Sequence, residues 1–159
     1  MRNFDFGKKF KLIIAPFRIF SHLITTDDHL SALRNIFNHL EKGGRFIFDV
    51  FLPNLKMIKE GNEDYLQFEG EYKPGKLLQR FESARPDYIN QIQHVTFKYV
   101  WEENGIHEEI VEFPFRYFFR YELEHLIARS GLILKNMYGD FEYGKLDSKS
   151  NNMICVCKR

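Results

Sequence analysis

Two apolar runs in the first third of the chain flank a segment of helical periodicity. Residues 10–17, "FKLIIAPF", and residues 45–51, "RFIFDVF", are apolar at most positions on both faces, as strands buried in a parallel sheet are. Between them, residues 27–41 repeat apolar positions at helical spacing. The order strand, helix, strand predicts a βαβ unit whose two strands are parallel and joined by a right-handed crossover.

The ends of this helix carry recognisable signals. Thr26 is a suitable N-cap, and the aspartates at 27–28 follow where the helix dipole favours negative charge. At the other end, Gly43 begins a glycine doublet and can take the left-handed conformation that ends a helix. Pro53 prevents the second strand from continuing. These signals predict a helix over 27–41 and a glycine turn into the second strand.

The middle of the chain has a different period. Residues 64–118 alternate polar and apolar positions, and Asn104-Gly105 between two such runs is a strong hairpin signal. We therefore predict an antiparallel β insertion over 64–118.

Helical spacing returns at residues 120–131, "RYELEHLIARSG", and two short apolar runs at 132–139 and 151–159 close the chain. The pattern as a whole predicts an α/β fold with two parallel strands, a C-terminal antiparallel hairpin and the β insertion. We expect one domain, 1–159, in which 1–60 and 119–159 form the core.

Length and charge narrow the class of protein. A chain of 159 residues suits one domain, and a net charge of +1 argues against a dedicated nucleic-acid binder. No apolar stretch approaches the roughly 18 residues of a membrane span, and "MRNFDFGKKF" lacks a signal-peptide core. Cys155 and Cys157 are too few for a disulfide framework and are typical of small packing residues. We expect a cytoplasmic protein that contacts neither membrane nor nucleic acid.

Three segments in this order resemble the C-terminal half of class I S-adenosylmethionine-dependent methyltransferases. They are Phe10 to Ile13 in the first strand, "LEKGGRF" from Leu40 to Phe46, and the pattern from Tyr121 to Leu132 that resembles the family's last helix. The insertion resembles the substrate-side insertion of small-molecule N- and O-methyltransferases. The resemblance implies a partial Rossmann-like methyltransferase sheet, S-adenosylmethionine as cofactor and a small molecule as substrate.

The sequence also departs from the family. Family members place a Gly-rich loop after the first strand and an acid at the end of the second, which hold the methionine part and the ribose of the cofactor. No two of the ten glycines here have G-x-G spacing, and the first recognisable strand matches the family's fourth. We therefore expect roughly the first half of the fold to be absent and the isolated chain to be inactive, as part of a split enzyme or a truncated product. The alternative is a non-catalytic interaction module with a methyltransferase fold.

The resemblance places the site residues around the end of the first strand. It implies contacts to the cofactor from Met1, Arg2, Ala15, Pro16 and Phe17, and contacts to substrate from Arg18, His22, Asp49 and Tyr117. Structural roles stay open for each of them: a plain strand-to-loop turn, a surface histidine, a carboxylate bonded to a loop amide.

Tyr117 belongs to the run "FPFRYFFRY", which as a strand would place alternate aromatic rings on one face. That face could line a substrate site or pack between the insertion and the core.

No catalytic residue is singled out, because methyl transfer depends on alignment of the reacting groups more than on covalent help. Metal ligands are not expected either. Asp28 and His29 are neighbours on a helix and point apart, and His107 lacks the H-E-x-x-H spacing of a zinc site.

The first predicted strand has no neighbour on one side. Without the first half of the fold, residues 11–16 would form an open apolar edge, which natural proteins avoid. Covering each large apolar side chain there contributes about 1.5–3 kcal/mol. We expect a homodimer or a separate N-terminal partner chain to cover the edge at 11–16.

Overall fold

The computed structural model describes residues 2–159 and divides the chain into two compact units. The first unit contains Met1–Pro53 and Arg116–Arg159, and the second contains Asn54–Phe115. The second unit thus begins ten residues before the predicted insertion at 64–118, since helix α2 (Leu55–Glu60) contacts a strand of that unit. Among the described residues, no helix is both long and apolar enough to cross a membrane.

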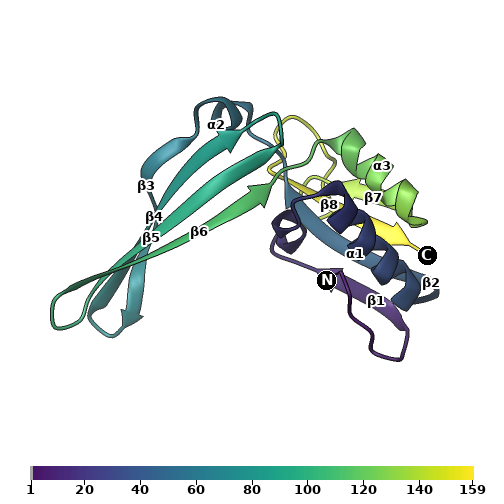
Figure 1. Ribbon diagram of the computed structural model, residues 1–159, viewed down its shortest axis with the longest axis horizontal. Coiled ribbons are helices and arrows are strands. Elements are labelled where there is room, and N and C mark those ends of the chain that lie inside the picture. The colour runs from purple at the N-terminus through teal and green to yellow at the C-terminus, as the bar shows by residue number, and fades with distance from the viewer. Residues whose placement is uncertain (1) are drawn as a thin grey trace. The chain divides into compact units, whose positions relative to one another are not determined.

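The first unit is built on a mixed four-stranded sheet (Figure 1). Its strands lie in the order β1-β2-β8-β7 and comprise β1 (Phe10–Ala15), β2 (Leu40–Phe51), β8 (Asn152–Lys158) and β7 (Ile133–Tyr138). The pair β1–β2 is parallel, whereas β2–β8 and β7–β8 are antiparallel. The predicted fold class is confirmed: two parallel strands and a C-terminal antiparallel hairpin in one sheet.

Helix α1 (Thr26–His39) joins the two parallel strands and is shorter than the predicted 27–41 at its C-terminal end. Its N-cap is Thr25, one residue before the predicted cap, and the Thr25 hydroxyl accepts a hydrogen bond from the backbone N–H of Asp28 at 3.1 Å. The helix ends at His39 because Leu40 already pairs with Phe10 of β1. A pairing between distant residues therefore overrode the local helical pattern.

The glycine doublet turns the chain within β2 instead of capping the helix. The register jumps from Phe10–Leu40 to Leu12–Arg45, so residues 41–44 are looped out of the regular ladder. Gly43 adopts the predicted left-handed conformation, with φ 82°. A Cβ on Gly44 would lie 3.0 Å from the carbonyl oxygens of both Phe10 and Glu41, so only glycine lets these backbone segments approach so closely.

One face of this sheet carries the hydrophobic core. Helix α1 contacts helix α3 (Arg120–Ser130), and α3 ends at Gly131 with φ 91°, as its sequence predicts. The short helix η1 (Ile19–His22) adds Phe20 to the same core. The sheet contributes alternate residues of two strands, all buried: Phe46, Phe48 and Val50 from β2, and Met153, Cys155 and Cys157 from β8. Both cysteines are free, which fits their predicted packing role.

The second unit is a four-stranded antiparallel sheet in the order β3-β4-β5-β6, preceded by α2. Its strands are β3 (Asn62–Lys73), β4 (Lys76–Asp87), β5 (Ile92–Glu102) and β6 (Ile106–Arg116). The predicted turn at Asn104-Gly105 joins β5 to β6, and both of its residues have positive φ. The antiparallel insertion is thereby confirmed as a sheet.

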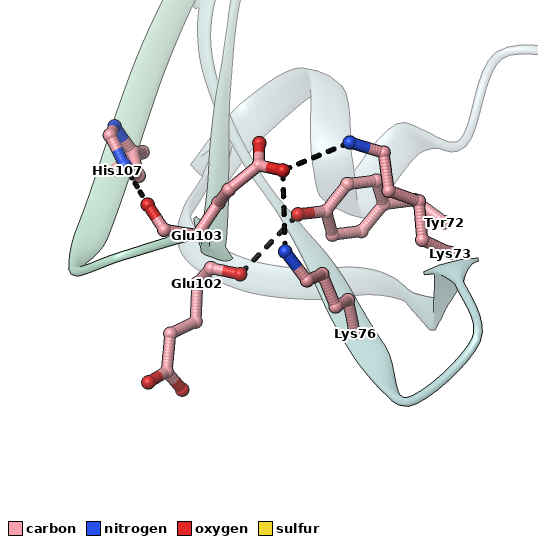
Figure 2. Close-up of polar contacts among 6 residues, drawn as sticks. All are labelled: Tyr72, Lys73, Lys76, Glu102, Glu103 and His107. Atoms are coloured by element: carbon pink, nitrogen blue, oxygen red, sulfur yellow. Dashed lines mark hydrogen bonds and ion pairs between the residues drawn. The ribbon is translucent and has the colours of Figure 1, made fainter.

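A polar network ties the two hairpin ends of this sheet together (Figure 2). The Nζ atoms of Lys73 and Lys76 lie 3.0 and 3.2 Å from Oε1 of Glu103, and these ammonium groups hold the pKa of Glu103 below its usual value. The Tyr72 hydroxyl donates to the carbonyl oxygen of Glu102 at 3.3 Å. Since the network links the β3–β4 turn to the β5–β6 turn, it serves the sheet's own structure.

The aromatic run "FPFRYFFRY" does not form one strand, contrary to the prediction. Strand β6 ends at Arg116, whose guanidinium donates to the carbonyl of Ile24 at 2.7 Å and to Glu122 at 2.8 Å. The next two side chains, Tyr117 and Phe118, are both buried although they are adjacent. In a strand with one face in solvent, adjacent side chains would alternate between buried and exposed, and these two do not.

Candidate functional site

The carboxyl ends of β1 and β2 lie together at one edge of the first unit's sheet, because the two strands are parallel and Ala15 pairs with Phe48. In open α/β sheets, ligands bind at this edge. After Pro16, the chain makes an unusual turn in which Phe17 and Arg18 both adopt left-handed φ angles of 59° and 57°. Consecutive non-glycine residues in this region are strained, and such strain clusters at ligand sites and switches.

Asp49 of β2 is hydrogen-bonded to this turn. Its side chain is only 5% exposed, and its Oδ1 accepts a hydrogen bond from the backbone N–H of Arg18 at 3.3 Å. This contact is the structural role that the sequence left open for Asp49, a carboxylate bonded to a loop amide. Because Asp49 is nearly buried, the N–H of Arg18 supplies part of the hydrogen bonding that this carboxylate loses from water.

The Arg18 side chain extends over the end of β2 and reaches β8. Its Nη2 donates to Oδ1 of Asn152 at 2.9 Å, and its guanidinium carbon lies 6.0 Å from the centroid of the Phe51 ring. The ring of Tyr117 lies 6.5 Å from that of Phe51. Four segments of the first unit thus converge here: the turn after β1, the end of β2, the start of β8 and the segment before α3.

Phe17 is 92% exposed in this turn, and its neighbours Pro16 and Arg18 are also exposed. An aromatic ring displayed so fully on a strained turn is expensive to leave in water, and it is available to contact an apolar or planar ligand. Tyr117, by contrast, is 1% exposed, so its hydroxyl and ring are enclosed by the protein. The arrangement presents a ring, a guanidinium and the polar end of β8 at one sheet edge.

The other predicted site residues lie at several places in the same unit. Ala15 is buried in the core, and His22 is exposed at the last position of η1. Arg2 forms an ion pair with Asp28 at the start of α1, and Met1 lies outside the described residues. The structure therefore places Arg18 and Tyr117 beside Phe51 and bonds Asp49 to the Arg18 amide, and the ligand contacts of all these residues stay predictions.

Two residues of this arrangement were not found from the sequence. Phe51 read as one more apolar residue of a buried strand, and Asn152 as a polar residue at the start of the predicted strand at 151–159. Asn152 lies 134 positions after Arg18, and only the antiparallel register that places Phe51 opposite Asn152 brings it to this edge. No local pattern marks such a partner.

Comparison with known proteins gives matches in three-dimensional structure alone. No protein-family model matches the sequence, and no curated protein does. Among solved structures, an S-adenosylmethionine-dependent methyltransferase from Clostridium acetobutylicum ATCC 824 matches with a TM-score of 0.74 and 17% identity over 99% of this chain. The CcbJ methyltransferase from Streptomyces caelestis matches over 98% with a TM-score of 0.75 and 20% identity.

A third match is CalS10, an amino pentose methyltransferase from Micromonospora echinaspora whose structure contains bound S-adenosylmethionine. It matches over 99% of this chain with a TM-score of 0.73 and 17% identity. This chain spans 61%, 64% and 61% of the three matched chains, in the order given. At such identities the likeness concerns the fold. The chain therefore has part of the fold of S-adenosylmethionine-dependent methyltransferases.

Proposed function

We propose that this chain is the substrate-side part of an S-adenosylmethionine-dependent methyltransferase that acts on a small molecule at the carboxyl ends of β1 and β2. The observation that carries the proposal is the strained Phe17–Arg18 turn, fixed by Asp49 at the sheet edge where α/β folds bind ligands. The matched structures add support, because they include the amino pentose methyltransferase and a sugar N-methyltransferase from Streptoalloteichus sp. that matches with a TM-score of 0.73 and 15% identity.

The residues at this edge suit the needs of methyl transfer. S-adenosylmethionine supplies a methyl group on a sulfonium, which passes to a nucleophilic nitrogen or oxygen of the acceptor as the carbon–sulfur bond breaks. The protein's share of this work is to align the reactants and exclude water. Phe17 and Pro16 offer apolar surface for that purpose, and the arginine at 18 can bind a polar or anionic group of the acceptor.

The fit to the cofactor is limited to one side. Apolar contacts are available at Pro16 and Phe17, but no two glycines of the chain have the G-x-G spacing that would let a loop approach the methionine part closely. We infer that the chain supplies one flank of the cofactor site and that the isolated chain does not complete a methyl transfer.

Two measurements test this proposal. S-adenosylhomocysteine at millimolar concentration is expected to shift the backbone amide resonances of residues 15–18 and of Asp49 in two-dimensional NMR spectra. In Phe17→Ala these shifts should be lost, whereas Phe141→Ala, which removes another exposed ring, should retain them.

Calorimetry supplies the second measurement. The isolated chain is expected to show no micromolar binding of S-adenosylmethionine. Micromolar binding would contradict the inference that this chain supplies only one flank of the cofactor site. An NMR spectrum that does not change at residues 15–18 would contradict the proposed site altogether.

The second candidate function is a non-catalytic interaction module with this fold. It is favoured by the apolar side chains of the edge strand, since Leu12 and Ile14 are 53% and 60% exposed. If S-adenosylhomocysteine causes no NMR shifts but a polypeptide strand binds alongside β1, the interaction module is favoured.

A further inference from the structure

Strand β1 has an unpaired edge. It is the terminal strand in the order β1-β2-β8-β7, and within the described residues its ladder partner is β2 alone. The backbone groups of Phe10–Ala15 that point away from β2 are therefore open to another strand. An edge of this kind is a template for adding a strand, because main-chain hydrogen bonds supply affinity and alternate side chains supply specificity.

The same strand exposes apolar side chains on the face opposite the core. Leu12 pairs with Arg45 and Ile14 pairs with Ile47, in alternation with Ile13, which packs on the core, and the buried Ala15. All three helices of the unit contribute their buried residues to the core face. Leu12 and Ile14 are thus more than half exposed on the other face, next to the unpaired edge.

The charges beside the edge argue against a second copy of this chain as its occupant. Residues 8–18 contain four cations, Lys8, Lys9, Lys11 and Arg18, and no acidic residue. Antiparallel pairing of two β1 strands would bring the lysines of one copy toward Arg18 of the other, and parallel pairing would place Lys11 beside Lys11. Like charges on neighbouring strands are unfavourable, whereas acidic side chains on the incoming strand would be attracted.

The matched methyltransferases indicate what the occupant carries. Nearly all of this chain, 99%, aligns with the Clostridium acetobutylicum enzyme, but it spans 61% of that enzyme's length. The remainder of that fold has no counterpart in these 159 residues. A sheet grows at its edges, and of the two terminal strands, β1 and β7, it is β1 whose carboxyl end adjoins the proposed site.

We propose that the edge of β1 and the adjoining Leu12 and Ile14 form a docking surface for a non-identical polypeptide segment that is not among these 159 residues. That segment adds a strand with apolar and acidic side chains beside β1 and carries the part of the methyltransferase fold that these residues do not span. The identity of the occupant rests on the proposed function, whereas the edge, the exposed side chains and the lysines stand independently of it.

Two labelled strand peptides test the docking surface. Each is about eight residues long, the length of an ordinary strand, and alternates valine with either glutamate or lysine. At low ionic strength, fluorescence anisotropy is expected to show about tenfold tighter binding of the glutamate peptide. Hydrogen exchange should localise the protection to the amides of Phe10–Ala15.

Variants sharpen the assignment. Reversing the charges with Lys8→Glu, Lys9→Glu and Lys11→Glu together is expected to reverse the peptide preference. The matched control, Lys56→Glu, Lys59→Glu and Lys149→Glu, changes the net charge equally at exposed positions outside the edge and should leave the preference intact. Ile14→Gln, which removes an exposed apolar side chain without adding charge, is expected to weaken the binding of both peptides without lowering the melting temperature.

Several results would overturn the inference. Equal binding of the two peptides, or protection away from β1, would exclude a charged docking edge. Equilibrium sedimentation showing a dimer that Ile14→Gln dissociates would make a second copy the occupant. The proposed function fails separately: peptide docking at β1 without any ligand shift at residues 15–18 would refute the methyltransferase site and leave the docking surface in place.

Discussion

The backbone N–H of Arg18 donates to Oδ1 of Asp49 at 3.3 Å, joining the turn after β1 to the carboxyl end of β2. The two residues are 31 positions apart, and their contact depends on the parallel pairing of the two strands. It fixes Phe17 and Arg18 in a conformation that neither residue favours.

Replacing Asp49 by alanine should destabilise the protein and release the turn. The change leaves the Arg18 amide without its acceptor in a partly buried place, which costs about 1–3 kcal/mol in the free energy of unfolding. Urea denaturation measures the loss, and faster hydrogen exchange at Arg18 reports the release. Asp49→Asn keeps an oxygen acceptor at the same position and is expected to lose less than about 1 kcal/mol. Equal losses in the two variants would show that the contact does not hold the turn.

The glycine doublet should respond differently at its two positions. A methyl group at Gly44 meets two backbone carbonyl oxygens at 3.0 Å, so Gly44→Ala is expected to cost about 1–3 kcal/mol by overpacking between β1 and β2. Gly43→Asn keeps a residue that tolerates positive φ and meets no nearby backbone, so it should cost less than about 1 kcal/mol. Thermal unfolding of both variants gives the comparison, and a greater loss in Gly43→Asn would contradict the proposed crowding.

His29 should make the stability depend on pH. Its ring is fully buried between Phe20 and Phe118, and burial, with a smaller contribution from the nearby Arg116 guanidinium, lowers its pKa to about 4. Glu122 acts in the opposite direction but does not compensate. The unfolded chain, with a histidine pKa near 6.5, binds a proton that the folded protein excludes, so stability is complete above about pH 6.5 and falls toward about pH 4.

The expected loss is about 2 kcal/mol between about pH 7 and about pH 5, measured by urea denaturation at each pH. His29→Leu removes the titrating group and should remove most of this slope, even if its overall stability differs. His125→Leu, at an exposed position of α3, should leave the slope unchanged. A slope that persists in His29→Leu would assign the pH dependence to other groups.

The two cysteine thiols should be unreactive in the folded protein. Burial raises the pKa of Cys157 to about 12 and the pKa of Cys155 well above its usual value, so almost no thiolate exists at neutral pH. With Ellman's reagent at about pH 8, the rate should be at least about 100-fold lower in buffer than in denaturant. Ser148→Cys introduces an exposed thiol that should react at once. Rapid reaction of the parent protein would contradict the buried packing of β8.

Much of the fold could be predicted from the order of polar and apolar residues. The runs at 10–17 and 45–51 predicted parallel strands, and the alternation at 64–118 predicted an antiparallel sheet. A strand buried on both faces is apolar throughout, whereas a strand buried on one face alternates, so each pattern can be recognised within a single element. Gly131 and Asn104-Gly105 marked a helix end and a hairpin, since positive φ is a local requirement.

The site itself was determined by contacts between residues far apart in the chain. The sequence placed Arg18 and Asp49 at the carboxyl ends of neighbouring strands, but the hydrogen bond to Asn152 arises from the antiparallel register of β8. The same holds where helix α1 ends at His39, since Leu40 pairs with Phe10, and where Tyr117 turns inward against Phe51. Periodicity records which face of one element is buried, whereas register and side-chain partners depend on how separate elements pack, and only the tertiary structure contains that information.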